Sequence, residues 1–327
     1  MRIKHWFVII LVIIFLPILI VNPYQRYVIS LGGIFCILTI GLNYVMGLCG
    51  QISLAHVAFW GVGAYVSALL VLRLNFPFIL ALLSAGIICL FLGAILGIPS
   101  LKIKGFYLAI TTLGFSQIIN LILNNWVDVT RGADGLPGIP PPGIGPFIFE
   151  TPLEKYYVIM ICLLFFIWTF IKVKDSRIGR AIQAIRDNEL AAEVMGINTH
   201  YYKVLSFALS AFIAGIAGSL FAHFVGYVSP DNFLSTDCFK ILCMLMIGGI
   251  GSTWGPIIGS LLIVILPEWL RFLRDYYIAI YGLAVVIIAI KMPNGIVGLA
   301  KQISFKFSWN PNRKKAYEKI TKEGRNK

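Results

Sequence analysis

The residues that could do chemistry in this chain are polar, uncharged side chains that interrupt long apolar stretches. Four lie in the segment GLNYVMGLCGQISLAHVAFWGVGAY and two begin the later run TTLGF; the six are Asn43, Gln51, Ser53, His56, Thr111 and Thr112. Polar groups at membrane depth either hydrogen-bond helices to one another or line a water-filled path. A single polar residue of this kind most often hydrogen-bonds one helix to another. The surrounding glycines favour a path at Gln51, Ser53 and His56, because irregular backbone at that depth is tolerated only against protein or water.

The chain has no motif of bond-making chemistry. The dipeptide Gly-Lys does not occur, so a GxxxxGK[ST] nucleotide loop is excluded, and neither a GxSxG elbow nor an HExxH helix is found. The cysteines and histidines lack the spacing of metal ligands, so we expect no metal site. Acidic residues stay near the ends of the apolar segments, with Asp237 and Glu268 closest to membrane depth. A transporter driven by an ion gradient is therefore disfavoured, as is a membrane enzyme.

Hydropathy predicts the elements that carry these residues. Apolar residues make up 59% of the 327 and charged residues only 13%, with a mean hydropathy of +0.87. This composition is typical of an all-α polytopic membrane protein, since a spanning helix needs roughly 20 apolar residues. We expect about ten spans, at 6–21, 27–46, 56–72, 78–98, 106–123, 156–171, 204–227, 239–250, 256–270 and 276–292. The eighth is short enough to be a broken helix, and 47–53 is equally ambiguous.

Basic residues predict how these helices are oriented. With ten spans, one set of loops and tails carries 20 of the 27 Lys and Arg, and the other set carries 7. Positive residues collect on the cytoplasmic side, so we expect both termini and residues 172–203 in the cytoplasm, with residues 125–155 outside. The basic charge follows the loops, and no nucleic-acid partner is expected. This organisation gives a transmembrane domain at 1–300 and a basic cytoplasmic tail at 301–327.

A charged, helix-forming segment lies at 172–203 between two apolar stretches. Asn188 or Asp187 can cap a helix with Glu189 in its first turn, and Gly196 can end that helix in a left-handed conformation. Its apolar face consists of Leu190, Ala191, Val194 and Met195. A helix of about eight residues is too short to be stable alone, so it needs a groove to bind. The alternative is a helix on the lipid surface, because a second apolar face precedes it beside several arginines.

Glycine and proline mark two further features. The sequence RGADGLPGIPPPGIGP, inside 125–155, is too rich in both for a helix or a regular strand. We expect a compact loop of turns and polyproline-like backbone, which fits a rigid linker as well as a lip around the mouth of a pathway. Gly251, Gly255 and Gly259 repeat every four residues, a spacing that lets helices pack closely.

Six motifs, in order along the chain, carry a family resemblance. They are GLNYVMGLCGQISLAHVAFWGVGAY, LKIKGFYLAITTLGF, NNWVDVTRGADGLPGIPPP, DSRIGRAIQAIRDNELAAEVMGIN, GYVSPDNF and MIGGIGSTWGPIIGSLL. On these motifs the chain resembles the LivM-type permease subunits of branched-chain amino-acid ABC transporters over almost its whole length. The resemblance implies one half of an importer pore for leucine, isoleucine or valine, in the cytoplasmic (inner) membrane of a bacterium or archaeon. Related permeases carry urea or short amides, which is the alternative substrate class.

The resemblance also implies partners that supply the energy. In ABC importers a cytoplasmic loop ending in glycine inserts a coupling helix into the ATPase. Here that role falls to Arg186, Asp187, Asn188, Glu189, Leu190, Ala191, Ala192, Glu193, Met195 and Gly196. Leu190 stands where the general motif has glutamate, and Glu189 precedes it. The implied partners are a LivH-like second permease, two cytoplasmic ATPase subunits and an extracytoplasmic substrate-binding protein. ATP and Mg²⁺ would belong to the ATPases, so this chain is expected to hold no cofactor and to be no enzyme.

Overall fold

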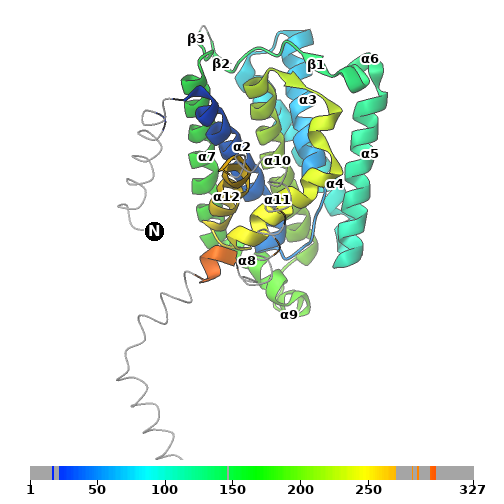
Figure 1. Cartoon of the computed structure of the whole chain (residues 1–327). Coiled ribbons are helices and arrows are strands. Elements are labelled where there is room, and N and C mark those ends of the chain that lie inside the picture. Colours follow the sequence, from blue (N-terminus) through cyan, green and yellow to red (C-terminus); the bar gives the residue numbers. More distant parts are fainter. Residues whose placement is uncertain are drawn as a thin grey trace, which may run out of the picture.

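The computed structural model describes residues 22–145 and 147–269, together with 17, 282, 286 and 295–299. The expected spans at 6–21 and 276–292 fall almost wholly outside the described residues, and the tail at 301–327 does so entirely. Within the described part the fold is a bundle of long helices joined by short ones (Figure 1). The helical class expected from hydropathy is confirmed.

Among the residues that the structure describes, six helices are long and apolar enough to cross a membrane, which makes this a multi-pass membrane protein. Each corresponds to one predicted span. They are α2 (Pro23–Leu42) continued by the π-helix η1 (Asn43–Leu48), α3 (His56–Leu74), α4 (Phe78–Gly97) with the 3₁₀ turn η2 (Pro99–Leu101), α5 (Phe106–Asn125), α7 (Pro152–Asp175) and α10 (Thr199–Val225). Two shorter helices, α11 (Ser235–Gly248) and α12 (Gly255–Trp269), correspond to the eighth and ninth predicted spans.

Helix α10 is the centre of the bundle and packs against α2, α3 and α4. Small residues allow this close approach: the backbone of Gly63 on α3 lies against Gly215 on α10, and Gly218 lies against the carbonyl of Trp60. A side chain at any of these glycines would collide with backbone, so the helix axes could not come so near. These small residues therefore allow α3 and α10 to pack closely.

The polar segment after α2 is where the bundle departs from regular helix. The π-helix η1 ends at Cys49, and residues 49–55 run without regular structure into α3. The amide of Leu54 donates to Thr112 Oγ1 on α5 at 2.9 Å, so one backbone group of this stretch is satisfied by a side chain. Short π-helical segments occur mostly as bulges in α-helices, and they are frequent at functional sites.

Two glycines of the predicted stripe bring α11 and α12 together, and the third does not. Gly255 and Gly259 lie against the backbone of Gly248 and Met244 respectively. Gly251 lies in the turn between the helices with φ of +74°, so its expected place on a helical stripe is corrected. The left-handed conformation there favours glycine for a reason unrelated to helix spacing.

The loop at 125–155 contains regular structure, contrary to expectation. It holds a helical turn, α6 (Val127–Thr130), a 3₁₀ turn, η3 (Gly132–Asp134), and three two-residue strands, β1 (Leu136–Pro137), β2 (Gly143–Ile144) and β3 (Phe147–Ile148). Strand β1 pairs antiparallel with β4 (Tyr227–Val228), which follows α10, and β2 pairs with β3. Proline is tolerated in so short an edge strand because only a few ladder hydrogen bonds are needed.

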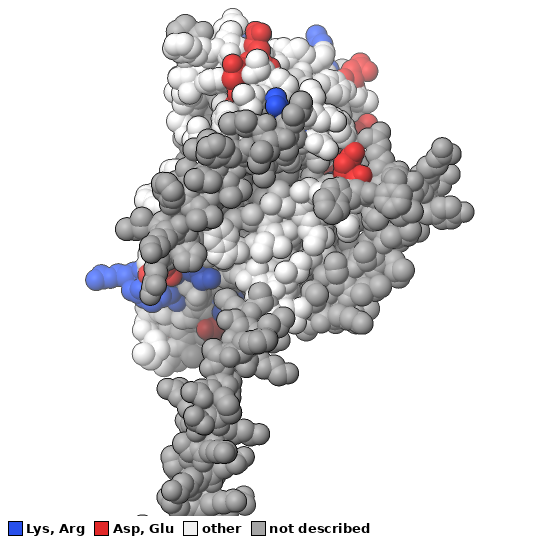
Figure 2. Space-filling view, turned by 60° about the vertical axis from the view of Figure 1, so that its left-hand side comes forward, with Lys and Arg blue, Asp and Glu red and all other residues white. Residues whose placement is uncertain are grey.

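Charge is unequally divided between the two ends of the bundle. Figure 2 shows Lys and Arg concentrated near the lower end of the visible face and Asp and Glu mostly in its upper half. The lower end is where α8 (Arg177–Asp187) and α9 (Glu189–Val194) lie (Figure 1). This is the pattern on which the predicted orientation depends.

Candidate functional site

The segment between α7 and α10 turns sharply because of one serine and one glycine. Ser176 is extended, ends α7, and caps α8 by accepting a hydrogen bond from Gly179 N at 3.2 Å. Gly179 is buried against the carbonyls of Val173 and Lys174, where a larger residue would not fit. Helix α8 then buries Ile182 and Ile185 against the bundle. Its apolar face therefore packs on protein, and the predicted alternative of a helix lying on lipid loses its main support.

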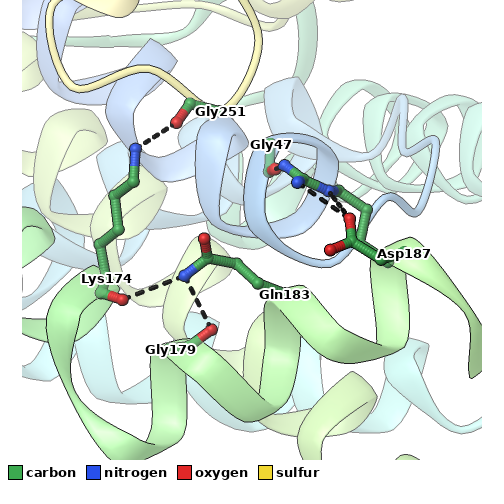
Figure 3. Close-up of polar contacts among 7 residues, drawn as sticks. Gly47, Lys174, Gly179, Gln183, Asp187 and Gly251 are labelled. Carbon is green, nitrogen blue, oxygen red and sulfur yellow. Dashed lines mark hydrogen bonds and ion pairs between the residues drawn. The ribbon is translucent and has the colours of Figure 1, made fainter. Parts of the chain in front are cut away.

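Two cationic side chains bond the end of α7 and the end of α8 to backbone carbonyls of other segments (Figure 3). Arg186 donates to Gly47 O in η1 at 2.8 Å, and Lys174 donates to Gly251 O in the α11–α12 turn at 2.6 Å. Gln183 donates to Lys174 O at 3.0 Å and Gly179 O at 3.1 Å, which holds α8 against the end of α7. Charge-assisted hydrogen bonds of this kind are stronger than neutral ones.

The same place is reached from α2 by Asn43. Its side chain accepts from Gly251 N at 2.8 Å and donates to Ser252 O at 2.8 Å. Asn43 is fully buried, and Gly47 has no room for a side chain because Asn43 and Gly251 occupy that space. The turn at Gly251 is thus hydrogen-bonded to Asn43 of η1 and to Lys174 at the end of α7. The same η1 accepts a hydrogen bond from Arg186 of α8 at Gly47 O.

Helix α9 follows the predicted pattern closely. Asn188 caps it by accepting from Ala191 N at 3.0 Å, and Gly196 follows its end with φ of +81°. The regular helix spans 6 residues, Glu189–Val194, against about eight predicted. The next helix, α10, starts at once, capped by Asn198, which accepts from Tyr201 N at 3.0 Å. Ser176, Asn188 and Asn198 cap α8, α9 and α10 in turn, and together they set the path of the chain from α7 to α10.

Glu189 anchors α9 to the bundle. Its carboxylate forms ion pairs with Lys104 at 2.7 Å and with Lys203 at 2.5 Å. Lys203 is fully buried on α10, whereas Lys104 is largely exposed before α5. Burial by itself disfavours the charged carboxylate, but hydrogen bonds from Lys104 and Lys203 outweigh it and lower the pKa of Glu189. The carboxylate is therefore charged at neutral pH and holds three segments together.

The apolar face of α9 points away from the protein. Leu190 is 73% exposed, Val194 87% and Met195 81%, whereas Ala192 is 4% exposed and forms the contact with the bundle. The four predicted face residues, Leu190, Ala191, Val194 and Met195, are all exposed. Large apolar side chains gathered on one exposed face mark a surface that binds another protein or a membrane. Figure 1 shows α9 at the lower extremity of the molecule.

Three of the six predicted pathway residues, Asn43, His56 and Thr112, hydrogen-bond separate segments of this chain to one another. His56 Nε2 lies 2.8 Å from Leu38 O and its Nδ1 3.3 Å from Ser210 Oγ, so it joins α3 to α2 and α10. Ser53 accepts locally from Ala55 N at 3.4 Å. Gln51 Oε1 is buried and has no hydrogen-bond partner among the described residues. The role of all these residues in a pathway stays a prediction.

Helix α5 leaves one side open. Thr112 is fully buried against residue 54, whereas Thr111 is half-buried and bonds only to Tyr107 O at 2.9 Å. Gln117 is exposed, and no described residue lies within 4 Å of a Cβ atom placed at Gly114. Polar groups on an exposed helix surface at membrane depth require a polar neighbour. This side of α5 is therefore not covered by the described part of the chain.

Sequence reasoning missed the residues that hold α8 and α9 in place. From the sequence, Lys104, Lys174 and Lys203 count only as charges of cytoplasmic loops, and Gly47 only as a neighbour of polar residues. Lys174, Lys203 and Gly47 bond to residues that lie 14 to 139 positions away along the chain. The one available signal is that all three lysines are predicted on the same side of the membrane as Glu189.

Comparison with known proteins gives consistent matches. Residues 25–290 match the family model described as branched-chain amino acid transport system / permease component. The chain is 30% identical over 295 residues to the high-affinity branched-chain amino acid transport system permease protein LivM of Escherichia coli (strain K12), covering 83% of this chain and 69% of that protein. It is 28% identical over 298 residues to the high-affinity branched-chain amino acid transport system permease protein LivH of Salmonella typhimurium, covering 83% and 93%.

An archaeal relative is also similar. The probable branched-chain amino acid transport permease protein LivM of Methanocaldococcus jannaschii is 26% identical over 243 residues, which covers 67% of this chain and 68% of that protein. No solved structure matches the chain significantly. The similarity to both LivM and LivH covers most of the helices described above.

Proposed function

Since this chain belongs to the family of branched-chain amino acid transport permeases, we propose that it forms one half of the translocation pathway of an ABC importer for leucine, isoleucine or valine. The other half would be a LivH-like permease, because relatives of both names exist and are similar to this chain. Two cytoplasmic ATPase subunits would bind ATP and Mg²⁺. An extracytoplasmic binding protein would deliver the amino acid, and the membrane would be the cytoplasmic membrane of a bacterium or archaeon.

The observation that carries the proposal is the exposed apolar face of α9. Leu190, Val194 and Met195 protrude from a helix that is capped at both ends and anchored through Glu189. Such a helix can enter a groove of an ATPase without first having to fold, so little conformational entropy is lost on binding. Movement of the ATPases then displaces α9, and through α8 the bonds at Gly47 and Gly251.

The pathway is proposed to run along the open side of α5. Thr111 and Gln117 offer polar groups there, and the buried oxygen of Gln51, which has no partner among the described residues, is close in sequence to the segment that contacts Thr112. Asn43, Ser53, His56 and Thr112 would shape this wall from inside the bundle. Alternating access is expected to change which of these groups meet water.

Proline substitution tests the coupling role. Ala191→Pro removes the amide that Asn188 caps, and Ala192→Pro places a ring inside α9. Both variants should still insert and assemble with the second permease, but uptake of labelled leucine into proteoliposomes should cease. Full uptake by either inserted variant would contradict the coupling role.

A charge substitution separates docking from folding. Val194→Asp puts a carboxylate on a side chain that is 87% exposed, so the chain should fold normally. Co-purification with the two ATPase subunits should be lost. The matched control is Val127→Asp, at a side chain that is 63% exposed on α6 at the other end of the molecule, and it should retain both ATPases.

Substrate class is tested through the binding protein. Calorimetry with the purified binding protein should detect leucine, isoleucine and valine, and no urea or acetamide. The reconstituted importer should likewise take up leucine, isoleucine and valine, and neither urea nor acetamide. Binding and uptake of urea in preference to leucine would replace the proposed substrate and leave the importer architecture unaffected.

A further inference from the structure

A cavity of about 630 Å³ lies at the end of the molecule remote from α9. It is bounded by the beginning of α2, the beginning of α11 and the end of α12. The cavity reaches along α2 as far as Phe35, and the remaining turns of α2 lead into η1, which contacts α8. Its volume is within the range of small-molecule sites.

The walls of the cavity combine two opposite charges with aromatic and aliphatic groups. Asp237 and Lys240 are three residues apart on α11, so both lie on the face that borders the cavity. The apolar walls come from Tyr27, Leu31 and Phe35 on α2 and from Ile263 and Val264 on α12. Tyr24 and Glu268 close one edge, where the phenol donates to the carboxylate at 2.8 Å.

Asp237 and Lys240 do not neutralise each other by direct contact. In the described part of the chain no ion pair within 4.0 Å joins them, although their charges act on each other through space. The ammonium of Lys240 lies 4.6 Å from the centroid of the Phe35 ring, a cation–π contact. Ionisable groups at membrane depth are costly and are retained mainly where they have a function. A ligand that carries one positive and one negative charge would give Asp237 and Lys240 each an oppositely charged partner.

We propose that this cavity receives a zwitterionic amino acid with a branched aliphatic side chain. Lys240 would hold the carboxylate, Asp237 the ammonium group, and the walls formed by Leu31, Phe35 and Ile263 the side chain. The proposal rests on the proposed function and deepens it, because it assigns substrate recognition to this chain. A phosphatidylethanolamine headgroup has the same pair of charges, so the experiment must distinguish the two.

A native cysteine allows a direct test. Cys243 borders the cavity, and of the six cysteines only Cys162 is exposed to a similar degree, the other four being buried. The complete importer carrying Cys162→Ser, in nanodiscs of phosphatidylcholine, would be treated with a small thiol reagent. Modification of Cys243, followed by mass spectrometry, should be slowed by leucine and not by urea. In Lys240→Met or Asp237→Asn, protection should require about tenfold more leucine.

Transport measurements complete the test. Lys240→Met and Asp237→Asn should lower leucine uptake by about tenfold while ATP hydrolysis by the assembled importer persists. Lys155→Met and Asp231→Asn neutralise matched charges outside the cavity and should leave uptake unchanged.

Three results would overturn the site. They are absence of leucine protection at Cys243, unchanged uptake in both cavity variants, and protection that comes from phosphatidylethanolamine nanodiscs with no further effect of leucine. In each case uptake of leucine by the wild-type importer would leave the proposed function standing. Loss of wild-type leucine uptake itself would refute the proposed substrate instead.

Discussion

At the scale of single residues, Glu189 is the point where three segments of the chain meet. Its carboxylate joins α9 to Lys203 on α10 and to Lys104 before α5. Removing the carboxylate would leave the fully buried ammonium of Lys203 without its partner, and breaking a buried ion pair on one side costs several kcal/mol. Glu189 therefore positions α9 without touching substrate.

The anchoring of α9 should depend on pH in one direction only. Burial opposes ionisation of Glu189, but Lys104 and Lys203 lower its pKa below the usual value of about 4.3. A group with a lowered folded pKa contributes stability above its unfolded pKa and loses it as the pH falls through the folded value. A spin label at Val194→Cys should thus be restrained at neutral pH and become mobile only as the pH falls below the usual pKa of glutamate.

Two variants control this measurement. Glu189→Gln should give a mobile label at every pH, because the carboxylate is absent. Glu193→Gln, at an exposed position of the same helix, should keep the pH profile of the parent. A label that stays restrained in Glu189→Gln would mean that Ala192 alone holds α9.

Arg186 should matter more than the other arginines of its helix. Arg186→Gln loses the charge-assisted bond to Gly47 O, and hydrogen bonds to charged groups contribute roughly 1.5–3 kcal/mol. We expect reduced leucine uptake per ATP hydrolysed in the assembled importer. Arg177→Gln, exposed at the start of α8, is the matched control and should transport normally. Equal uptake-to-hydrolysis ratios in the two variants would show that the Gly47 bond transmits nothing.

At this scale the sequence predicts local features and misses distant ones. The cap at Asn188 and the left-handed Gly196 depend on neighbours within a few residues, so both are predictable. The bonds of Glu189 to Lys104 and of Arg186 to Gly47 join residues far apart in the chain. Several lysines on the same side could satisfy Glu189, and only the packing of α10 selects Lys203.

At the scale of elements, glycine has two opposite roles in this bundle. Gly259 on α12 lies against the backbone of Met244 on α11, whereas a methyl group added at Gly114 on α5 would meet nothing within 4 Å in the described part of the chain. Gly259→Ala should separate two helices and cost about 1–3 kcal/mol. Gly114→Ala should gain up to about 1 kcal/mol from helix propensity.

Thermal unfolding in detergent distinguishes the two substitutions. The midpoint should fall for Gly259→Ala and should hold or rise for Gly114→Ala. A fall of similar size in both would indicate that the open side of α5 is covered within the chain itself. The two variants thus also test whether α5 faces a partner.

The sequence predicts helices well where hydropathy alone determines them. The six long helices coincide with predicted spans because about 20 consecutive apolar residues are best accommodated by a helix that crosses the membrane. The π-helix at 43–48 and the pairing of β1 with β4 are not predictable. The first depends on the Asn43 contacts with the Gly251 turn, and the second on two loops that α10 brings together.

At the scale of the whole molecule, the uneven charge predicts the orientation in the membrane. The α8–α9 end is basic and the opposite end is rich in Asp and Glu (Figure 2). We expect a cysteine at Val194 to react with an impermeant reagent only from the cytoplasmic side, and a cysteine at Glu150 only from outside. Labelling of intact cells and of inverted vesicles measures this, and the opposite pattern would reverse the proposed direction of transport.

The pairing of β1 with β4 has a mechanical consequence. Strand β4 directly follows α10, and the other end of α10 carries Lys203, which holds α9. A single 27-residue helix, about 40 Å long at 1.5 Å per residue, therefore links the Gly/Pro-rich loop to α9. A tilt of this rod moves both ends at once and in opposite senses, so a push on α9 reaches the far surface without a relay of intermediate contacts.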